Sequence, residues 1–154
     1  MVEGKMYAAE IERMKTATAR VEQNKAVVKR YWDGKWNKRQ PSILDELQTL
    51  DVVYRSPTLK MNGIEEYRQV YGSYLTAFQD TEIVIEDMIA EGDKVVTRIR
   101  LSGVHRGELE GIPPTGKRFS VIAYTVFRLV YGRIAEEWEL FDELTLMREL
   151  EAIK

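Results

Sequence analysis

The spacing of apolar residues changes once along this chain, near Asp80. Before Asp80, apolar side chains recur every three or four positions, which is the spacing of one face of a helix. After it, runs rich in β-branched and aromatic residues are separated by short turn sequences. Helices followed by hairpin-linked strands predict an α+β fold, with the helices packed on one face of an antiparallel sheet.

Three helical patterns precede Asp80. The first spans residues 6–33, either as one helix or as an arm of about twenty residues followed by the domain's own first helix. Gly34 predicts its end, because glycine tolerates the left-handed conformation that closes helices. Pro41 opens a short second helix. The apolar side of that helix comprises Ile43, Leu44, Leu47 and Leu50, and a third helix covers Ile64–Phe78. We expect residues 1–23 to form an N-terminal helical extension and residues 24–154 to form a single domain.

The second half of the chain predicts a sheet. Its strands are expected at Thr81–Ala90, Lys94–His105, Phe119–Val130 and Arg133–Asp142, with a shorter strand at 51–57 and a last helix over 143–152. If this sheet curls around the helices without filling the space between them, a concave pocket remains. Any chemistry is expected in that pocket.

Composition excludes several classes of function. The 23 basic and 25 acidic residues give a net charge of −2 without a basic stripe, which argues against nucleic-acid binding. The absence of cysteine excludes disulfides and thiolate chemistry, and a single histidine excludes any site with two imidazoles. No spacing of carboxylates suits a metal, so we expect none. No apolar run is long enough to span a membrane, and no signal peptide is visible, so a cytoplasmic protein is expected.

The strand predicted at Arg133–Asp142 carries carboxylates on both of its faces. Period-two alternation places Ile134, Glu136, Trp138, Leu140 and Asp142 on one face, and Ala135, Glu137, Glu139 and Phe141 on the other. Either Glu136 and Glu137 lie in solvent with Trp138 in the core, or the inward face brings a carboxylate into the pocket. Burial would raise the pKa of such a carboxylate, which suits a general base near neutral pH.

Three further groups could take part in chemistry. His105, the only imidazole, lies where a β-run meets a loop, as a hydrogen-bonded structural residue or as a catalyst. Arg98 and Arg100 share one face of their strand; they lie in solvent or supply an interior cation that holds a carboxylate. Tyr31 and the tryptophans near it form either core packing or an apolar pocket wall.

Two stretches of this sequence resemble the SnoaL-like polyketide cyclases, also called ester cyclases. They are GVHRGELEGIPPTGK from Gly103 and FRLVYGRIAEEWE from Phe127, and NKAVVKRYWDGKWN at 24–37 is similar to the family's opening helix. The resemblance covers about residues 24–150. It implies the nuclear-transport-factor-2-like fold, a cone-shaped, curved, antiparallel-rich sheet wrapped by N-terminal helices around one deep pocket.

The resemblance also implies a site. In the cyclases an acidic residue directly after the position of Trp138 is the general acid and base of an intramolecular aldol closure, without metal or organic cofactor. That position is Glu139 here, where the family has Asp. The family's histidine, seven residues before the turn glycine, corresponds to Thr125. Tyr31 lies where an aromatic residue approaches the pocket in these enzymes.

The sequence therefore predicts a cofactor-independent enzyme of the cyclase or isomerase type, acting on a small apolar carbonyl compound. Glu139 would be the acid/base, His105, Thr125 and Arg98 would orient the substrate or tune Glu139, and Tyr31 would line the wall. The alternative is a non-catalytic small-molecule-binding or dimerisation module, which Thr125 at the histidine position favours.

Self-association is also expected. Neither face of the strand at 119–130 consists of polar residues throughout, although helices are expected on one side of the sheet only. A partner subunit would cover the second face. We therefore expect a homodimer or a higher homo-oligomer.

Overall fold

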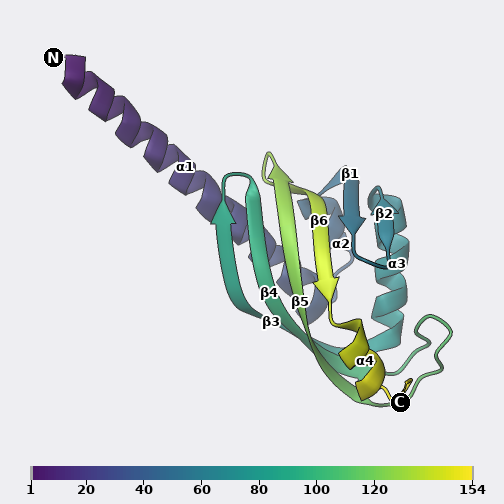
Figure 1. Ribbon diagram of the computed structural model, residues 1–154. Helices are drawn as coiled ribbons and strands as arrows, with labels where there is room; N and C mark the ends of the chain where they lie inside the picture. The colour runs from purple at the N-terminus through teal and green to yellow at the C-terminus, as the bar shows by residue number, and fades with distance from the viewer. Residues whose placement is uncertain (1, 154) are drawn as a thin grey trace.

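The computed structural model describes residues 2–153 and confirms the α+β architecture (Figure 1). In chain order the elements are α1 (Val2–Trp32), the π-helix η1 (Asp33–Asn37), α2 (Ser42–Leu47), β1 (Gln48–Arg55), β2 (Lys60–Asn62), α3 (Ile64–Ala77), β3 (Phe78–Glu91), β4 (Lys94–His105), β5 (Arg118–Val130), β6 (Arg133–Phe141) and α4 (Glu143–Glu149). The strands form a six-stranded sheet in the order β2-β1-β6-β5-β4-β3, in which only the β1–β6 pair is parallel.

The sheet curves around the helices that precede it (Figure 1). Irregularities in strand pairing, which bend a strand, occur twice between β3 and β4 and once between β5 and β6. On β5, Val121, Ala123, Thr125, Phe127 and Leu129 all lie on the concave face and are at most 3% exposed. That face therefore forms one wall of the hydrophobic core, and the end of α1, together with α2 and α3, covers it.

The two faces of β6 are resolved by burial. Glu137 is fully buried and Ala135 is 8% exposed, whereas Leu140 on the other face is 61% exposed. The face that carries Glu137 and Glu139 therefore points inward. Trp138 lies outside the core, with its ring 5.8 Å from the guanidinium carbon of Arg55, so the alternative that placed Trp138 in the core is wrong.

The helix α1 is continuous, but only its last part belongs to the body of the fold. Residues 2–20 are all exposed, and Figure 1 shows this segment extending away from the sheet. From residue 24 onward one side is buried through Asn24, Val28, Tyr31 and Trp32. The same three-and-four spacing of apolar residues therefore covers the sheet at one end of the helix and remains exposed at the other.

Gly34 does not end the helix in a left-handed turn, as the sequence predicted. The chain continues into η1, where the Lys38 amide donates to the carbonyl of Asp33 at 2.9 Å. A Cβ atom at Gly34 would lie 2.6 Å from Cγ1 of Ile43, which is buried on α2. Glycine is needed here because α2 packs directly against the backbone of η1. Leu50 also differs from expectation, since α2 ends at Leu47 and Leu50 is 78% exposed on β1.

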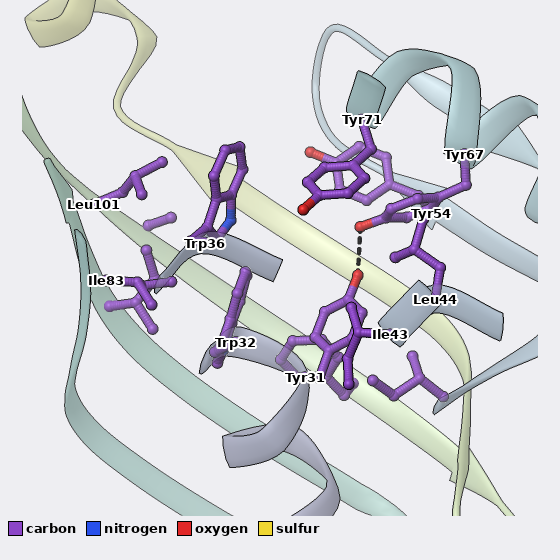
Figure 2. Packing of buried hydrophobic residues seen from close by; sticks show 14 of the residues in the cluster. Tyr31, Trp32, Trp36, Ile43, Leu44, Tyr54, Tyr67, Tyr71, Ile83 and Leu101 are labelled. Atoms are coloured by element: carbon purple, nitrogen blue, oxygen red, sulfur yellow. Dashed lines mark hydrogen bonds between the residues drawn. The ribbon is translucent and has the colours of Figure 1, made fainter. Parts of the chain in front are cut away.

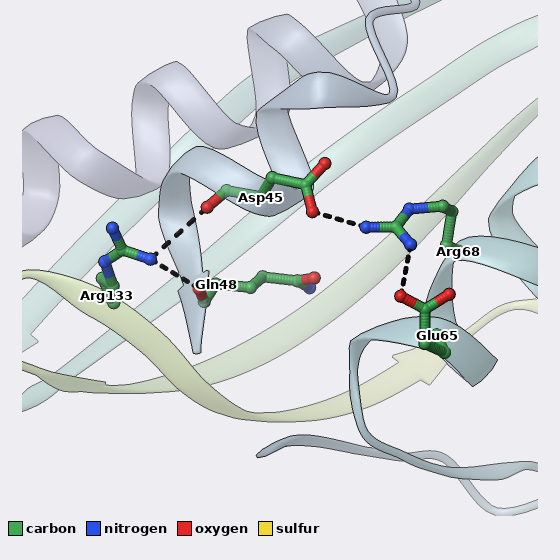
Figure 3. A network of polar contacts seen from close by, with 5 residues as sticks. All are labelled: Asp45, Gln48, Glu65, Arg68 and Arg133. Carbon is green, nitrogen blue, oxygen red and sulfur yellow. Dashed lines mark hydrogen bonds and ion pairs between the residues drawn. The ribbon is translucent and has the colours of Figure 1, made fainter. Parts of the chain in front are cut away.

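A network of surface polar contacts links α2 to its neighbours (Figure 3). Arg68 on α3 pairs with Asp45 on α2 and, at 2.6 Å, with Glu65. Arg133 at the start of β6 donates to the carbonyl oxygens of Asp45 and Gln48, each at 3.4 Å. Exposed ion pairs of this kind contribute about 0–1 kcal/mol each. The network therefore orients α2, while the apolar core supplies most of the stability.

The close packing at Gly34 predicts a measurable difference between two glycine substitutions. Gly34→Ala is expected to destabilise the fold by about 1–3 kcal/mol, because the new methyl group overlaps the side chain of Ile43. Gly72→Ala, in the middle of α3 with nothing within 4 Å of its added Cβ, is expected to stabilise it by about 0.5–1 kcal/mol. Urea unfolding followed by circular dichroism measures both, and equal effects would contradict the packing described here.

Candidate active site

A cavity of about 270 Å³ lies between the concave face of the sheet and the helices. Its apolar wall is formed by Trp32, Trp36, Leu59, Tyr74, Phe78, Ile99, Leu101, Ala123 and Phe141. Its polar groups come from Lys35, Tyr54, Ser56, Thr58, Glu110, Glu139 and Glu143. A cavity that combines apolar walls with converging polar groups is typical of small-molecule sites.

Glu139 is half-buried on the wall of this cavity. Its position on β6 lies opposite Thr125 on β5, and the Thr125 hydroxyl donates to Oε2 at 3.1 Å. The Tyr54 hydroxyl donates to Oε1 at 2.9 Å. Burial raises the pKa of Glu139, and the Lys35 charge and these two hydrogen bonds only partly oppose the shift. Within residues 2–153, no lysine or arginine forms an ion pair with this carboxyl group.

Lys35 extends from η1 and lines the same cavity, although it is only 7% exposed. Its Nζ donates to the Tyr67 hydroxyl at 2.6 Å. Five aromatic rings surround Nζ, with centroids at 4.9–5.7 Å: Tyr31, Trp32, Trp36, Tyr67 and Tyr71. Burial lowers the pKa of Lys35, because the ammonium ion loses its hydration, while the charges of Glu137 and Glu139 oppose the shift.

A second carboxyl group, Glu137, belongs to a fully buried polar cluster beside the cavity. Its Oε1 accepts from the Tyr31 hydroxyl at 2.7 Å and from the Gln48 amide at 3.0 Å, and its Oε2 accepts from the Tyr67 hydroxyl at 2.9 Å. The hydroxyls of Tyr31 and Tyr67 are themselves 2.6 Å apart, as the dashed line in Figure 2 shows. Glu137 is thus tied to α1, β1 and α3 and does not line the cavity.

Tyr31 belongs to this cluster and is fully buried. The aromatic residues of this segment that line the cavity are instead Trp32 and Trp36. The expectation that Tyr31 lines the wall therefore needs correction, because its hydroxyl donates to Glu137 and points toward the hydroxyl of Tyr67 (Figure 2). Thr125 is also fully buried, and its contact is with Glu139 rather than with the cavity itself.

His105 lies at the end of β4 and is completely buried. Its Nδ1 lies 3.0 Å from the Thr115 hydroxyl, and its ring packs edge-on against Phe78, which lines the cavity. The two glycines of the GVHRG motif allow close backbone contacts, since a Cβ would lie 3.0 Å from the Gln79 carbonyl at Gly103 and 2.4 Å from the Thr76 carbonyl at Gly107. The motif therefore packs the end of β4 against the junction of α3 and β3, and His105 does not line the cavity.

Arg98 lies outside the cavity, on the opposite face of the sheet. Its Nη1 pairs with Glu86 at 2.5 Å, and Arg100 pairs with the same carboxylate at 2.8 Å. Since side chains alternate across a strand, Thr97 and Ile99 point inward and Arg98 points outward. Its placement argues against the expected contact with a ligand or with Glu139.

Two cavity residues, Lys35 and Tyr54, were not identified from the sequence. Lys35 follows Trp32 by three residues and Tyr31 by four, so it continues the buried side of α1 into η1. This helical spacing could have indicated that Lys35 is buried, but a lysine is ordinarily expected to lie in solvent. Tyr54 alternates with buried Val52 on β1, which placed its ring inside but did not indicate Glu139 as its partner.

Residues 2–153 contain neither a cluster of metal ligands nor a membrane-spanning helix. Nowhere in that range do three or more His, Cys, Asp or Glu side chains gather closely enough to hold a metal ion. No helix in the same range is long and apolar enough to cross a membrane.

The burial of Glu139 predicts how stability changes with pH. The folded chain holds the Glu139 proton more tightly than the unfolded chain, so folding is penalised as pH rises from about 4.5 through the raised pKa. Glu139→Gln removes this penalty. We expect the variant to be more stable than the wild type near neutral pH, with the difference vanishing by about pH 4.

The matched control for this prediction is Glu136→Gln, on the opposite face of β6 from Glu139. Glu136 pairs with Arg128 at 2.8 Å on the outer face. Its replacement is expected to leave stability unchanged or to lower it by up to about 1 kcal/mol at neutral pH. Melting temperatures across a pH series measure both variants, and a Glu139→Gln protein less stable than wild type at every pH would contradict the burial argument.

Comparison with known proteins gives the chain's relatives. The family model described as SnoaL-like polyketide cyclase matches residues 26–150. No curated protein matches the chain. TsrD from Streptomyces laurentii is 29% identical, with a TM-score of 0.77 over 86% of this chain and 97% of its own.

Two further solved structures are similar over most of their length. A candidate SnoaL-like polyketide cyclase from Jannaschia sp. CCS1 is 28% identical, with a TM-score of 0.79 over 86% of this chain and 94% of its own. IdmH, a candidate polyketide cyclase from Streptomyces antibioticus, is 26% identical, with a TM-score of 0.73 over 84% of this chain and 99% of its own. The fold is thus the expected nuclear-transport-factor-2-like cone, and the chain belongs to the SnoaL-like polyketide cyclase family.

Proposed function

We propose that this protein is a cofactor-independent enzyme of the cyclase or isomerase type that acts on a small apolar carbonyl compound. The observation that carries the proposal is the position of Glu139. It is a half-buried carboxyl group on the wall of a cavity with both apolar and polar lining, and its hydrogen-bond partners, Tyr54 and Thr125, are neutral. A raised pKa allows such a group both to accept and to return a proton near neutral pH.

The proposed reaction uses Glu139 twice. Its carboxylate first removes a proton from a methylene group beside a carbonyl, and the electrons of the broken C–H bond move into an enolate. In an aldol closure the enolate carbon then attacks a second carbonyl of the same molecule, which becomes an alkoxide. Glu139 returns the proton to that alkoxide, so the enzyme ends in its starting state. The apolar wall favours this sequence because a low-dielectric site strengthens the interaction of Glu139 with the reacting atoms.

The hydrogen bonds to Glu139 have a defined part in this proposal. Tyr54 and Thr125 each donate to one carboxyl oxygen, which fixes the plane of the carboxyl group. Thr125 cannot itself titrate, so it acts as a positioning residue. The similarity to family members named as polyketide cyclases supports a carbonyl substrate with several oxygens.

Loss of the proton-transfer group tests the proposal. Glu139→Gln is expected to slow enzyme-dependent deuterium exchange at the methylene of ethyl acetoacetate by roughly 10²–10⁴-fold, since this is the usual contribution of a general base. Glu136→Gln, on the outer face of the same strand, should exchange at the wild-type rate. The loss of the methylene signal by proton NMR in deuterated buffer, corrected for the rate without protein, gives the measurement.

Binding measured on the same proteins separates an enzyme from a binding module. If wild type and Glu139→Gln bind ethyl acetoacetate equally but neither accelerates exchange, the chain is a non-catalytic module and the acid/base role of Glu139 is refuted. Equal acceleration by both would also refute it.

We further propose that the outer face of the sheet pairs with a second copy of this chain. Exposed apolar side chains lie on that face: Val84, Ile89, Tyr124 and Leu140 are 47%, 65%, 52% and 61% exposed. Tyr124 and Leu140 are opposite each other on β5 and β6, so they form one contiguous patch. On the same face, the carboxylate of Glu86 pairs with both Arg98 and Arg100.

This self-association is tested by adding charge to the patch. Wild type is expected to have the mass of a dimer or larger oligomer in light scattering at micromolar concentration. The double variant Tyr124→Lys/Leu140→Lys should have the mass of a monomer, because two like charges would face their symmetry copies. Leu144→Lys, an equally exposed leucine on α4, should behave as wild type. A monomeric wild type would end the proposal.

A further inference from the structure

The proposed acid/base chemistry gives no role to the amine of Lys35, which also lines the cavity. Lysines are rarely buried without a carboxylate partner. Lys35 is more than nine-tenths buried, and among residues 2–153 no carboxylate oxygen lies within ion-pairing distance of its Nζ. Its one hydrogen-bond partner in that range is the Tyr67 hydroxyl. An ammonium or amine with unused hydrogen-bonding capacity therefore lies at the cavity that holds Glu139.

The surroundings of Nζ restrict what it can do. The rings of Trp32 and Trp36 lie 5.4 and 5.6 Å from Nζ, and both residues line the cavity together with Lys35. Aromatic faces attract a cation but replace only part of the hydration that it loses. Burial lowers the pKa of Lys35, which enlarges the fraction of neutral amine available as a nucleophile.

The elements around Lys35 hold it in one place. Its backbone lies in the π-helix, its carbonyl accepts a hydrogen bond from the Tyr71 hydroxyl, and its Nζ contacts Tyr67. Tyr67 is held in turn by Glu137 at 2.9 Å. A π-helical turn is uncommon and is found frequently at functional sites. Here η1 keeps Lys35 on the buried side that begins in α1, three residues after Trp32.

We infer that Lys35 is a nucleophile that binds a ketone carbonyl of the ligand covalently, as a Schiff base, in the cavity it shares with Glu139. The inference rests on the proposed function and deepens it, because it names the ligand class as ketones with a free carbonyl carbon. An ester or carboxylate carbonyl alone would not be held in this way.

The step balances with the groups present. The Nζ lone pair of the neutral amine attacks the carbonyl carbon and the C=O π bond breaks. The nitrogen then loses one proton and the oxygen gains it, which gives a neutral carbinolamine. Protonated Glu139 then donates to that hydroxyl, which leaves as water while the C=N bond forms. The Glu139 carboxylate produced by this step can remove a proton from the adjacent carbon, because the iminium is a stronger electron acceptor than the ketone. Hydrolysis by one water molecule reverses the capture, so no oxidant or reductant is consumed.

Pentane-2,4-dione tests this inference directly, since a lysine that captures it loses water to form an enaminone that absorbs in the near ultraviolet. The full chain is incubated with the dione, and the added mass is located by peptide mapping. We expect one adduct on Lys35, formed on the order of tenfold or more faster than on exposed lysines such as Lys29 and Lys60. These exposed lysines are internal controls in the same digest.

Variants at Lys35 and Glu139 test whether the fast adduct requires the Lys35 amine, and circular dichroism checks that each variant is folded. Lys35→Arg, which retains the positive charge, and Lys35→Met, which retains the stem, should both lack the fast adduct while keeping the wild-type circular dichroism spectrum. Glu139→Gln should still be labelled on Lys35, at a reduced rate. Modification spread evenly over surface lysines, with Lys35 unmodified in folded wild type, would overturn the inference.

The outcomes separate this inference from the proposed function. Glu139-dependent exchange of ethyl acetoacetate without any adduct on Lys35 would refute covalent capture and leave the acid/base proposal standing. A fast adduct on Lys35 with no Glu139-dependent exchange would refute the acid/base proposal and support the amine site alone.

Discussion

The buried carboxylate of Glu137 is the interaction on which the rest of the structure depends. Three hydrogen bonds, from Tyr31 on α1, Gln48 on β1 and Tyr67 on α3, hold it on β6. Leaving a buried polar group without one of its hydrogen-bond partners typically costs about 1–3 kcal/mol, and more when the group is charged. The helices and the two adjacent strands are thus held at fixed positions, and the cavity beside them keeps its shape.

The cavity combines two ionisable groups that burial affects in opposite directions. The pKa of Lys35 is lowered and that of Glu139 is raised, in each case chiefly because the charged form loses hydration. Both shifts reduce the stability of the fold at neutral pH relative to an apolar pair of similar size. Residues that reduce stability in this way are characteristic of sites selected for chemistry rather than for packing. Glu137, by contrast, is fully hydrogen-bonded and has a structural role.

The GVHRG residues at the end of β4, which carry part of the family resemblance, do not line the cavity. Gly103 and Gly107 permit backbone contacts that a Cβ would prevent, and His105 fills the space between β4 and its loop. These residues define how the end of the sheet closes. Lys35, Tyr54 and Glu139 come instead from η1, β1 and β6. Lys35 and Glu139 lie in two other stretches that carry the resemblance, so the residues that shape the fold and those that line the cavity occupy different parts of the same family pattern.

Local periodicity predicted most of the strands: the predicted strand Lys94–His105 coincides with β4, and Arg133–Asp142 differs from β6 by one residue. It did not predict β2, and it assigned Leu50 of β1 to a helix. It left open whether a carboxylate of β6 points inward. It could not choose the face, because both carry glutamate and the choice depends on the irregular pairing with β5. Nor could local periodicity predict that Lys35 and Tyr54 line the same cavity as Glu139, or that Arg98 lies outside this cavity. Alternation and helical spacing follow from backbone geometry within a few residues. The placement of the cavity residues relative to one another depends instead on sheet curvature and on contacts between segments about a hundred residues apart.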